Sequence, residues 1–171
     1  MGNDIGFRLA NQGVEMFSGG AVGMDSAFEQ GYIRARRKSL CNIILPKNGF
    51  NGRTVDEENT YLIKGYPRHI LNACDKLISC FHSHYEELNG FAYWAHIRNC
   101  IQVLGHDLAT PVDEVFLWAP PNGLGVKGGT NTAFRVAQSR GIPCWNLANP
   151  EHYKIVEERF DLKPNNLDFL M

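Results

Sequence analysis

The chain lacks the features of secreted, membrane-spanning and duplex-DNA-binding proteins. Its 171 residues contain no apolar run long enough to cross a bilayer, and no signal peptide is recognisable. The five cysteines are odd in number and form no C-x-x-C pair, so we expect buried free thiols in a reducing compartment. We therefore expect a cytoplasmic protein. The cysteines are Cys41, Cys74, Cys80, Cys100 and Cys144.

The chain also lacks an excess of charge of either sign. Its formal net charge is −1, whereas a dedicated duplex-DNA-binding domain is usually strongly basic. A local basic groove remains compatible with this total. With 44% hydrophobic and 20% charged residues, the composition is that of a folded protein, and the length favours one domain over 1–171.

Glycine, in contrast, is concentrated in two segments more than a hundred residues apart. Residues 18–25 are SGGAVGMD, and residues 127–137 are KGGTNTAFRVA. Each segment is predicted to be a loop that opens a helix, where backbone N–H groups and the helix dipole suit an anion. Two such loops indicate a nucleotide or a nucleic-acid backbone held between them.

Hydrophobic periodicity predicts strands that alternate with helices. The predicted strands are 14–17, 41–45, 112–118 and 142–147, and the predicted helices are 5–11, 24–36, 67–81, 90–104, 130–140 and 151–159. The long turn-rich segment 47–60 suits a functional lid or flap. The alternation predicts a Rossmann-like, doubly wound α/β fold: a mainly parallel sheet with helices on both faces and ligands at the carboxyl ends of the strands.

One feature departs from that fold. The chain begins almost directly with a helix, where a doubly wound domain normally begins with a strand. We expect the first strand to be missing, either from this sequence or from the natural protein.

The two glycine segments resemble the signatures of a known family. The stretch 18–25 resembles the S-G-G-A-x-G-x-D loop of the DNA-processing protein A (Smf) family, in the SLOG superfamily. The stretch 128–143 resembles its second signature, a G-x-x-x-T-A loop followed by a helix and a strand. Small single-domain phage relatives are more similar still, through R-N-x-x-Q-V-L-G-x-D-L at 98–108, a W-x-x-x-G turn after residue 118, and G-I-P-x-x-N-L at 141–147.

The resemblance implies a nucleotide, a nucleotide-derived small molecule or single-stranded DNA as partner, with no cofactor and no membrane. It also implies a homodimer as one option and a host's cytoplasm if the protein is phage-encoded. The superfamily includes "lonely guy" phosphoribohydrolases, whose P-G-G-x-G-T-x-x-E motif carries a catalytic Glu. In the corresponding stretch here, 126–134, no Glu follows the threonines, and Arg135 is the next charged residue. Full-length family members also have further domains that a chain of this length does not hold.

The first loop supplies the first candidate site. Gly19, Gly20 and Gly23 would let the backbone approach a phosphate, Ser18 would donate its hydroxyl, and Asp25 would brace the loop. The alternative is a tight turn in which glycine serves geometry alone.

The second loop supplies the next candidates. Gly128 and Gly129 would offer amides, Thr130 and Thr132 would bond a phosphate or ribose, and Arg135 would clamp an anion. Alternatively, Thr130 only caps the helix and Arg135 is merely solvated.

Three further side chains complete the candidate binding site. Arg98 and Asn99 lie in a mostly apolar predicted helix, where Arg98 either contacts phosphate or forms a surface ion pair. Trp118 ends a predicted strand, where it either stacks on a base or packs in the core. The stretch 80–86, CFHSHYE, is not expected to bind a metal, and the basic run 34–38 is expected to be a solvated helix end.

Two functions from different classes follow. The first is a binding module that holds a nucleotide or a short single strand at the two loops. The second is a nucleotide N-glycosidic hydrolase, whose oxocarbenium-like transition state needs a carboxylate near the anomeric carbon. Glu29 and then Asp25 are the weak catalytic candidates, and a solvated helix face is the alternative for Glu29.

Overall fold

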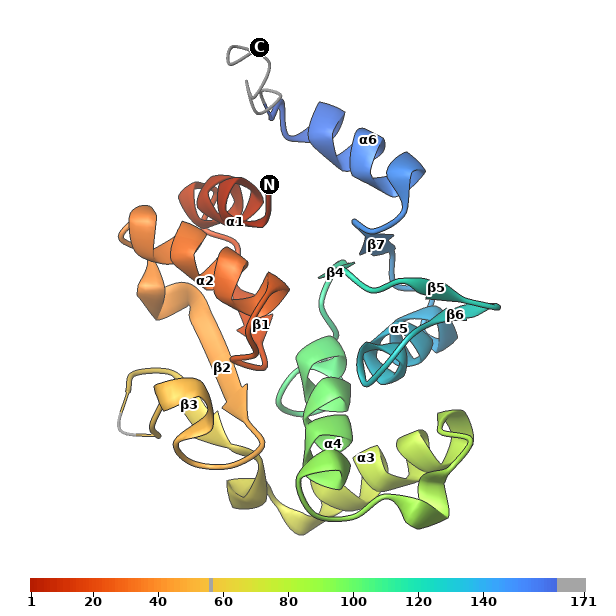
Figure 1. Cartoon of the computed structure of the whole chain (residues 1–171). Coiled ribbons are helices and arrows are strands. Elements are labelled where there is room, and N and C mark those ends of the chain that lie inside the picture. Colours follow the sequence, from red (N-terminus) through yellow and green to blue (C-terminus); the bar gives the residue numbers. More distant parts are fainter. Residues whose placement is uncertain (56, 163–171) are drawn as a thin grey trace.

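The computed structural model describes residues 1–55 and 57–162, and it has an α/β architecture (Figure 1). The predicted domain extends to residue 171, so its last nine residues, 163–171, lie outside the described part. Within the described ranges, no helix combines the length and the apolar composition that crossing a membrane requires.

The N-terminal half of the chain builds a three-stranded parallel sheet. Its strands are β1 (Met16–Ser18), β2 (Cys41–Leu45) and β3 (Thr60–Leu62), in the order β1-β2-β3, and Ser18 pairs with Ile43, which pairs with Thr60. Helix α1 (Gly2–Asn11) precedes β1, and α2 (Met24–Arg34) connects β1 to β2. The two helices pack so closely that a Cβ on Gly31 would lie 2.3 Å from the carbonyl oxygen of Asn3.

The C-terminal half builds a second parallel pair. Strand β4 (Val115–Leu117) pairs with β7 (Cys144–Asn146), and α5 (Thr130–Ser139) lies between them in the chain. A short antiparallel hairpin of β5 (Pro121–Asn122) and β6 (Gly125–Val126) precedes α5. The remaining helices are α3 (Arg68–Phe81), α4 (Gly90–Leu104) and α6 (Pro150–Arg159). Single 3-10 turns lie at Lys38–Leu40, Phe50–Gly52, Ile63–Gly65 and Tyr85–Glu87.

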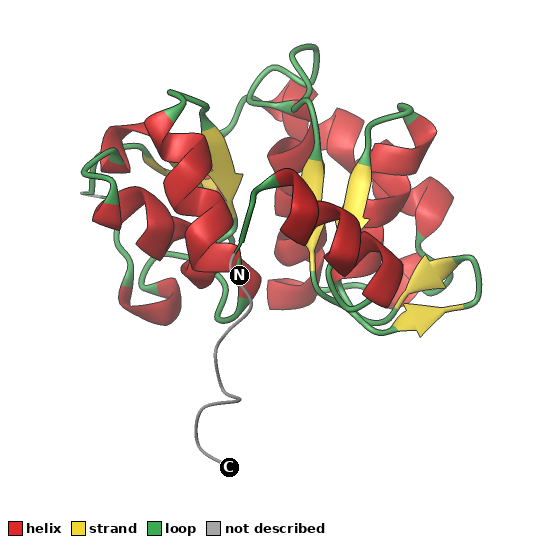
Figure 2. Ribbon diagram, turned by 90° about the horizontal axis from the view of Figure 1, so that it is seen from above, coloured by secondary structure: helices red, strands yellow, loops and turns green. Residues whose placement is uncertain are grey.

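The buried apolar residues form two main clusters, and each cluster contains residues of both sheets. One cluster joins α1, α2 and α6 to Met16 and Ile43 of the first sheet and to Phe116 of β4. The other joins α3, α4 and α5 to Ile44 of the first sheet and to Val115 of β4. Helices therefore pack against both faces of the strands (Figure 2).

The structure differs from the predicted single sheet, because β1 and β4 do not pair with each other. A cavity lined by all residues of both strands separates them. Two elements were not predicted: β3, which begins at the last residue of the predicted loop 47–60, and the β5-β6 hairpin, which lies between the predicted strand 112–118 and the predicted helix 130–140. Both are only two or three residues long, which is too short for an alternating pattern to be detected.

Candidate functional site

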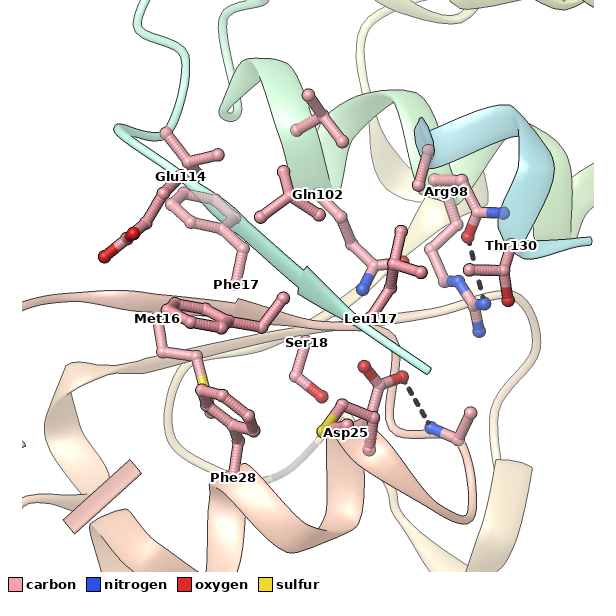
Figure 3. Close-up of a pocket in the computed structure, with 18 of the residues that line it drawn as sticks. Met16, Phe17, Ser18, Asp25, Phe28, Arg98, Gln102, Glu114, Leu117 and Thr130 are labelled. Atoms are coloured by element: carbon pink, nitrogen blue, oxygen red, sulfur yellow. Dashed lines mark hydrogen bonds between the residues drawn. The ribbon is translucent and has the colours of Figure 1, made fainter. Parts of the chain in front are cut away.

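The candidate site is the cavity between β1 and β4, with a volume of about 860 Å³. In Figure 3, Met16 and Glu114 lie towards one end of the cavity, and Ser18 and Leu117 lie further along it. The carboxyl ends of the two strands therefore lead to the same region of the cavity, which Asp25 of the first loop and Gly129 and Thr130 of the second loop also line. Of the predicted site residues, the cavity is lined by Ser18, Asp25, Arg98, Asn99, Trp118, Gly129 and Thr130.

The first loop uses its amides within the chain. The Gly19 and Ala21 amides both donate to Asp25 Oδ2, at 3.1 and 3.0 Å, and the Gly20 amide donates to Ser18 Oγ at 3.0 Å. This corrects the expectation that the amides of Gly19 and Gly20 are open to a phosphate. The physical reason is that the Asp25 carboxylate, at the start of α2, already occupies the anion position of the loop.

Glycine is required in this loop for backbone conformation and for close packing. Gly20 has a φ of 66° and Gly23 has a φ of 104°, both in the region that favours glycine. Gly19 is required by close approach, because a Cβ there would lie 2.5 Å from the guanidinium carbon of Arg98. The expected bracing role of Asp25 agrees with this arrangement.

The second loop leaves its amides open. Gly128 has a φ of 76°, and Gly129 is the residue before the first turn of α5. Among the described residues, no acceptor receives a hydrogen bond from the amides of Gly128, Gly129 or Thr130, whereas the next two amides of the chain bond back to the loop carbonyls. Open amides at a helix N-terminus form a partial positive charge, which favours an anion.

Arg98 and Asn99 of α4 connect the two loops. Arg98 Nη1 donates to the carbonyl oxygen of Gly19 at 2.9 Å, and its Nη2 donates to Asn99 Oδ1 at 3.1 Å. Asn99 Nδ2 then donates to the carbonyl oxygen of Gly129 at 2.9 Å. Two segments more than a hundred residues apart are thus brought together through adjacent side chains of one helix.

The charge of Arg98 is nearly buried and has no acidic partner. Arg98 is 9% exposed, and none of the ion pairs among residues 1–55 and 57–162 includes it. Its Nε is buried without a hydrogen-bond partner. Burial lowers the pKa of the guanidinium, and the nearby charge of Asp25 partly offsets this. An arginine nevertheless remains a cation in a protein, so this site holds a positive charge that no ion pair neutralises.

The structure places the other predicted residues in different surroundings. Trp118 is 60% exposed and lines the cavity directly after β4. Thr132 is buried and bonds His96 Nδ1 at 2.6 Å, and burial lowers the pKa of His96 to about 4.

Arg135 does not line the cavity; it lies beside the β5-β6 hairpin near Gly125 and donates to Gln138. The proposed clamp by Arg135 therefore needs correction, because its position one turn along α5 faces the hairpin.

The two catalytic candidates are both engaged in structural contacts. Glu29 is buried, accepts from Ser18 Oγ and forms an ion pair with Arg53, and it does not line the cavity. This corrects the expectation of a solvated helix face for Glu29. Burial raises its pKa, while the bonds from Ser18 and Arg53 act in the opposite direction. Asp25 lines the cavity and accepts the two loop amides.

Sequence reasoning missed a side chain that lines the cavity and two that contact the first loop without lining the cavity. Gln102 lines the cavity one helical turn after Arg98, and Figure 3 shows it on the same side of α4. The four-residue spacing between them was the available signal. Asn51 and Arg53 come from the segment predicted to be a lid, and both donate to the carbonyl oxygen of Gly20, at 2.8 and 3.4 Å. No sequence signal connects that segment to the loop.

Two other sequence features have no part in the cavity. No group of three or more potential metal ligands occurs in the described part of the chain. In the basic run, Arg34 pairs with Asp4 and Lys38 pairs with Glu57, and both pairs are half-exposed at the surface.

Comparisons of the chain with protein-family models, curated proteins and solved structures returned no match. The geometry of the cavity therefore carries the functional argument.

Proposed function

We propose that the chain binds a phosphate-bearing ligand, a nucleotide or a short single strand of nucleic acid, at the loop end of the cavity. The observation that carries this proposal is the nearly buried guanidinium of Arg98, which has no acidic partner and an unpaired Nε. A buried charge without a partner is costly, and a bound anion would compensate it.

The open end of α5 supports the same ligand class. Asn99 links Arg98 to the carbonyl oxygen of Gly129, so the guanidinium lies in one hydrogen-bonded unit with the loop that carries the open amides. A phosphate between them would receive charge-assisted bonds from the arginine and backbone bonds from the helix. This assigns the anion to the second loop and gives the first loop the role of positioning Arg98.

An exposed aromatic side chain at the same end suits a base. Trp118 offers a largely exposed ring at the end of β4, and stacking on such a ring is tolerant of base identity. A doubly wound Rossmann-like arrangement, as expected from the sequence, would place ligands at this edge of the strands. A nucleotide is therefore the ligand that we propose.

The hydrolase alternative has less support. Glu29 is held by Ser18 and Arg53 outside the cavity lining, so it does not offer a free carboxylate to a bound sugar. Asp25 lies in the cavity, but its Oδ2 accepts two amides. We propose a binding module in preference to an enzyme.

The test measures nucleotide binding and product formation in the same samples. Thermal unfolding is followed with adenosine monophosphate, NAD or inorganic phosphate, and each mixture is then analysed for free base. A binding module raises its midpoint with nucleotide and releases no base, because a ligand that prefers the native state stabilises it. No stabilisation by any of the three would contradict the proposal, and released base would favour the hydrolase.

A salt titration separates a nucleotide from a longer strand. If only one or two phosphates are held near Arg98, the slope of log K against log salt for a single strand will be about −0.7 per phosphate contacted. A slope corresponding to many contacts would indicate a nucleic-acid groove elsewhere on the surface.

A further inference from the structure

The cavity between β1 and β4 has the properties of a missing position in one sheet. Its lining includes Met16, Phe17 and Ser18 of β1 and Val115, Phe116 and Leu117 of β4. β1 pairs only with β2, and β4 pairs only with β7, so each strand has one edge without a partner strand in the described chain. Unpaired strand edges template the addition of another strand.

The two sheets pack against the same two layers of helices. Phe116 of β4 packs with the cluster that contains Met16, and its ring lies 5.3 Å from that of Phe28 on α2. Val115 packs with the opposite cluster, as does Phe17 of β1. The side chains of β1 and β4 therefore alternate between the same two helical layers, as they would in one continuous sheet.

We propose that the cavity is the seat of one further parallel strand, joined to the chain ahead of Met1, which would complete a continuous sheet in the order β3-β2-β1-new strand-β4-β7. The strand and the proposed ligand would share this cavity: the strand would fill the part between β1 and β4, and the ligand is assigned to the loop end.

The handedness of crossover connections assigns the side on which the new strand lies. Parallel strands joined through a helix are connected in a right-handed sense in about 98% of cases. Helices α1 and α2 pack in the same cluster and cover the same face, so a strand–α1–β1 unit steps in the same direction as β1–α2–β2. Since β2 lies on one side of β1, the new strand lies on the other side, which is the cavity.

The second sheet gives the same answer independently. Val136 and Ala137 of α5 pack in the opposite cluster, so the right-handed β4–α5–β7 unit steps in the opposite direction. This leaves the free edge of β4 facing the free edge of β1. The direction of winding therefore reverses at the proposed strand.

The start of α1 is in the right place for a short connection. Gly2 lies against the first turn of α2, where a Cβ on it would be 3.0 Å from Ala27 and 3.1 Å from Met24. This first turn follows the carboxyl end of β1, which is also where a parallel neighbour would end. A few residues are sufficient to join such a strand to Met1.

The lining also defines the chemistry of the strand. Leu9 and Phe28 line the cavity from one layer, and Val103 lines it from the other. A strand buried on both faces is a continuous hydrophobic run rather than an alternating one. We expect five or six residues rich in valine and isoleucine, roughly the usual strand length.

The experiment extends the chain and measures stability and amide exchange. One variant carries six valine and isoleucine residues and a three-residue glycine–asparagine linker ahead of Met1. One control replaces the two central strand residues with proline, and another has a glycine–serine extension of equal length. The valine–isoleucine extension should raise the melting midpoint by roughly 5 °C or more and slow exchange at Phe17 and Phe116 about a hundredfold. The proline and glycine–serine controls should do neither.

Each other outcome is also decisive. Aggregation of the controls alongside a well-behaved extended chain supports the proposal, because exposed strand edges promote association. Equal midpoints and equal exchange in all three variants would overturn it. A dimer of the unextended chain with protected Phe17 and Phe116 amides would assign the gap to a second copy.

Discussion

At the scale of single residues, the structure contains two buried charges in opposite situations. Glu29 is satisfied within the fold, because it accepts from Ser18 and pairs with Arg53. Arg98 donates only to a carbonyl and an amide oxygen and keeps one unpaired N–H. A buried pair serves the fold, whereas a buried single charge reduces stability unless a ligand compensates it.

Substitution of Arg98 should therefore have opposite effects on stability and binding. Arg98→Met removes a buried charge without an ion-pair partner while keeping most of the side-chain volume, so the free energy of unfolding should stay within about 1 kcal/mol or increase. Binding of adenosine monophosphate should weaken roughly tenfold to hundredfold, because charge-assisted bonds are lost. Denaturant titration and calorimetry measure the two effects, with Arg135→Met as the matched control. Unchanged affinity in Arg98→Met would remove the arginine from the site.

Asp25 should oppose the ligand rather than assist it. Asp25→Asn keeps an oxygen for the loop amides but removes a negative charge near Arg98. We expect a loss of stability of about 1 kcal/mol and a several-fold gain in phosphate affinity. The same two measurements check this prediction. Weaker phosphate binding in this variant would contradict the prediction, and base release that the native chain shows and the variant lacks would favour a catalytic carboxylate.

His96 should make stability depend on pH. Burial, with smaller contributions from His82 and Arg98, lowers its pKa from 6.5 to about 4. Between these values the unfolded chain binds more protons than the folded chain. The contribution of the neutral His96 to the free energy of unfolding is therefore fully present above pH 6.5, and it is lost as the pH decreases towards 4. We expect a loss of about 2 kcal/mol after allowance for screening.

His96→Asn provides the control for this pH effect. The asparagine amide can still bond the Thr132 hydroxyl, but it does not titrate. Urea denaturation at pH 7.5 and pH 5 should show a smaller difference for the variant than for the native chain. An equal difference in both would assign the pH dependence to other groups.

At the scale of elements, α4 organises the site. Its adjacent Arg98 and Asn99 side chains reach one glycine loop each, so the relative position of the two loops depends on this helix. Gly19→Ala tests this dependence, because the new Cβ would lie 2.5 Å from the guanidinium carbon. The flexible end of Arg98 can move away, so we expect a stability loss of only about 1 kcal/mol.

Ligand binding should be more sensitive to Gly19→Ala than stability is. Moving the guanidinium breaks its bond to the Gly19 carbonyl and its alignment with Asn99, and we expect affinity to fall at least tenfold. Gly65→Ala is the matched control, since no atom lies within 4 Å of its added Cβ. Calorimetric titration of both variants checks this prediction. Equal affinities would contradict the positioning role of the first loop.

Single elements could be predicted from the sequence, whereas contacts between distant elements could not. Helix periodicity predicted α4 with its observed bounds, and the apolar run predicted β2 equally well. The bridge from Arg98 and Asn99 to the two loops was unpredictable, because it depends on how α4 packs against segments distant in the chain. The bracing of the first loop by Asp25 could be predicted from local chemistry. The glycine motif nevertheless also favoured an external anion at the same amides.

At the scale of the whole molecule, the near-neutral charge limits the ligand. A net charge of −1 attracts no long polyanion, so the proposed binding would depend on one local cationic site. The two parallel sheets place that site where their strands end, and the cavity between β1 and β4 leads to it (Figure 3). In the proposed function, the second loop thus holds the phosphate and the first loop supports Arg98.

The most direct test is a titration of the isotope-labelled protein with adenosine monophosphate, followed by amide and arginine Nε resonances. The proposed phosphate site predicts saturable chemical-shift changes at the amides of Gly128, Gly129 and Thr130 and at Arg98 Nε. Changes at Gly19 and Gly20 should be much smaller, because their amides are already hydrogen-bonded. The proposed site would be contradicted if the titration saturated without shifting the Arg98 and Gly129 resonances, or if no resonance showed saturable shifts at millimolar nucleotide.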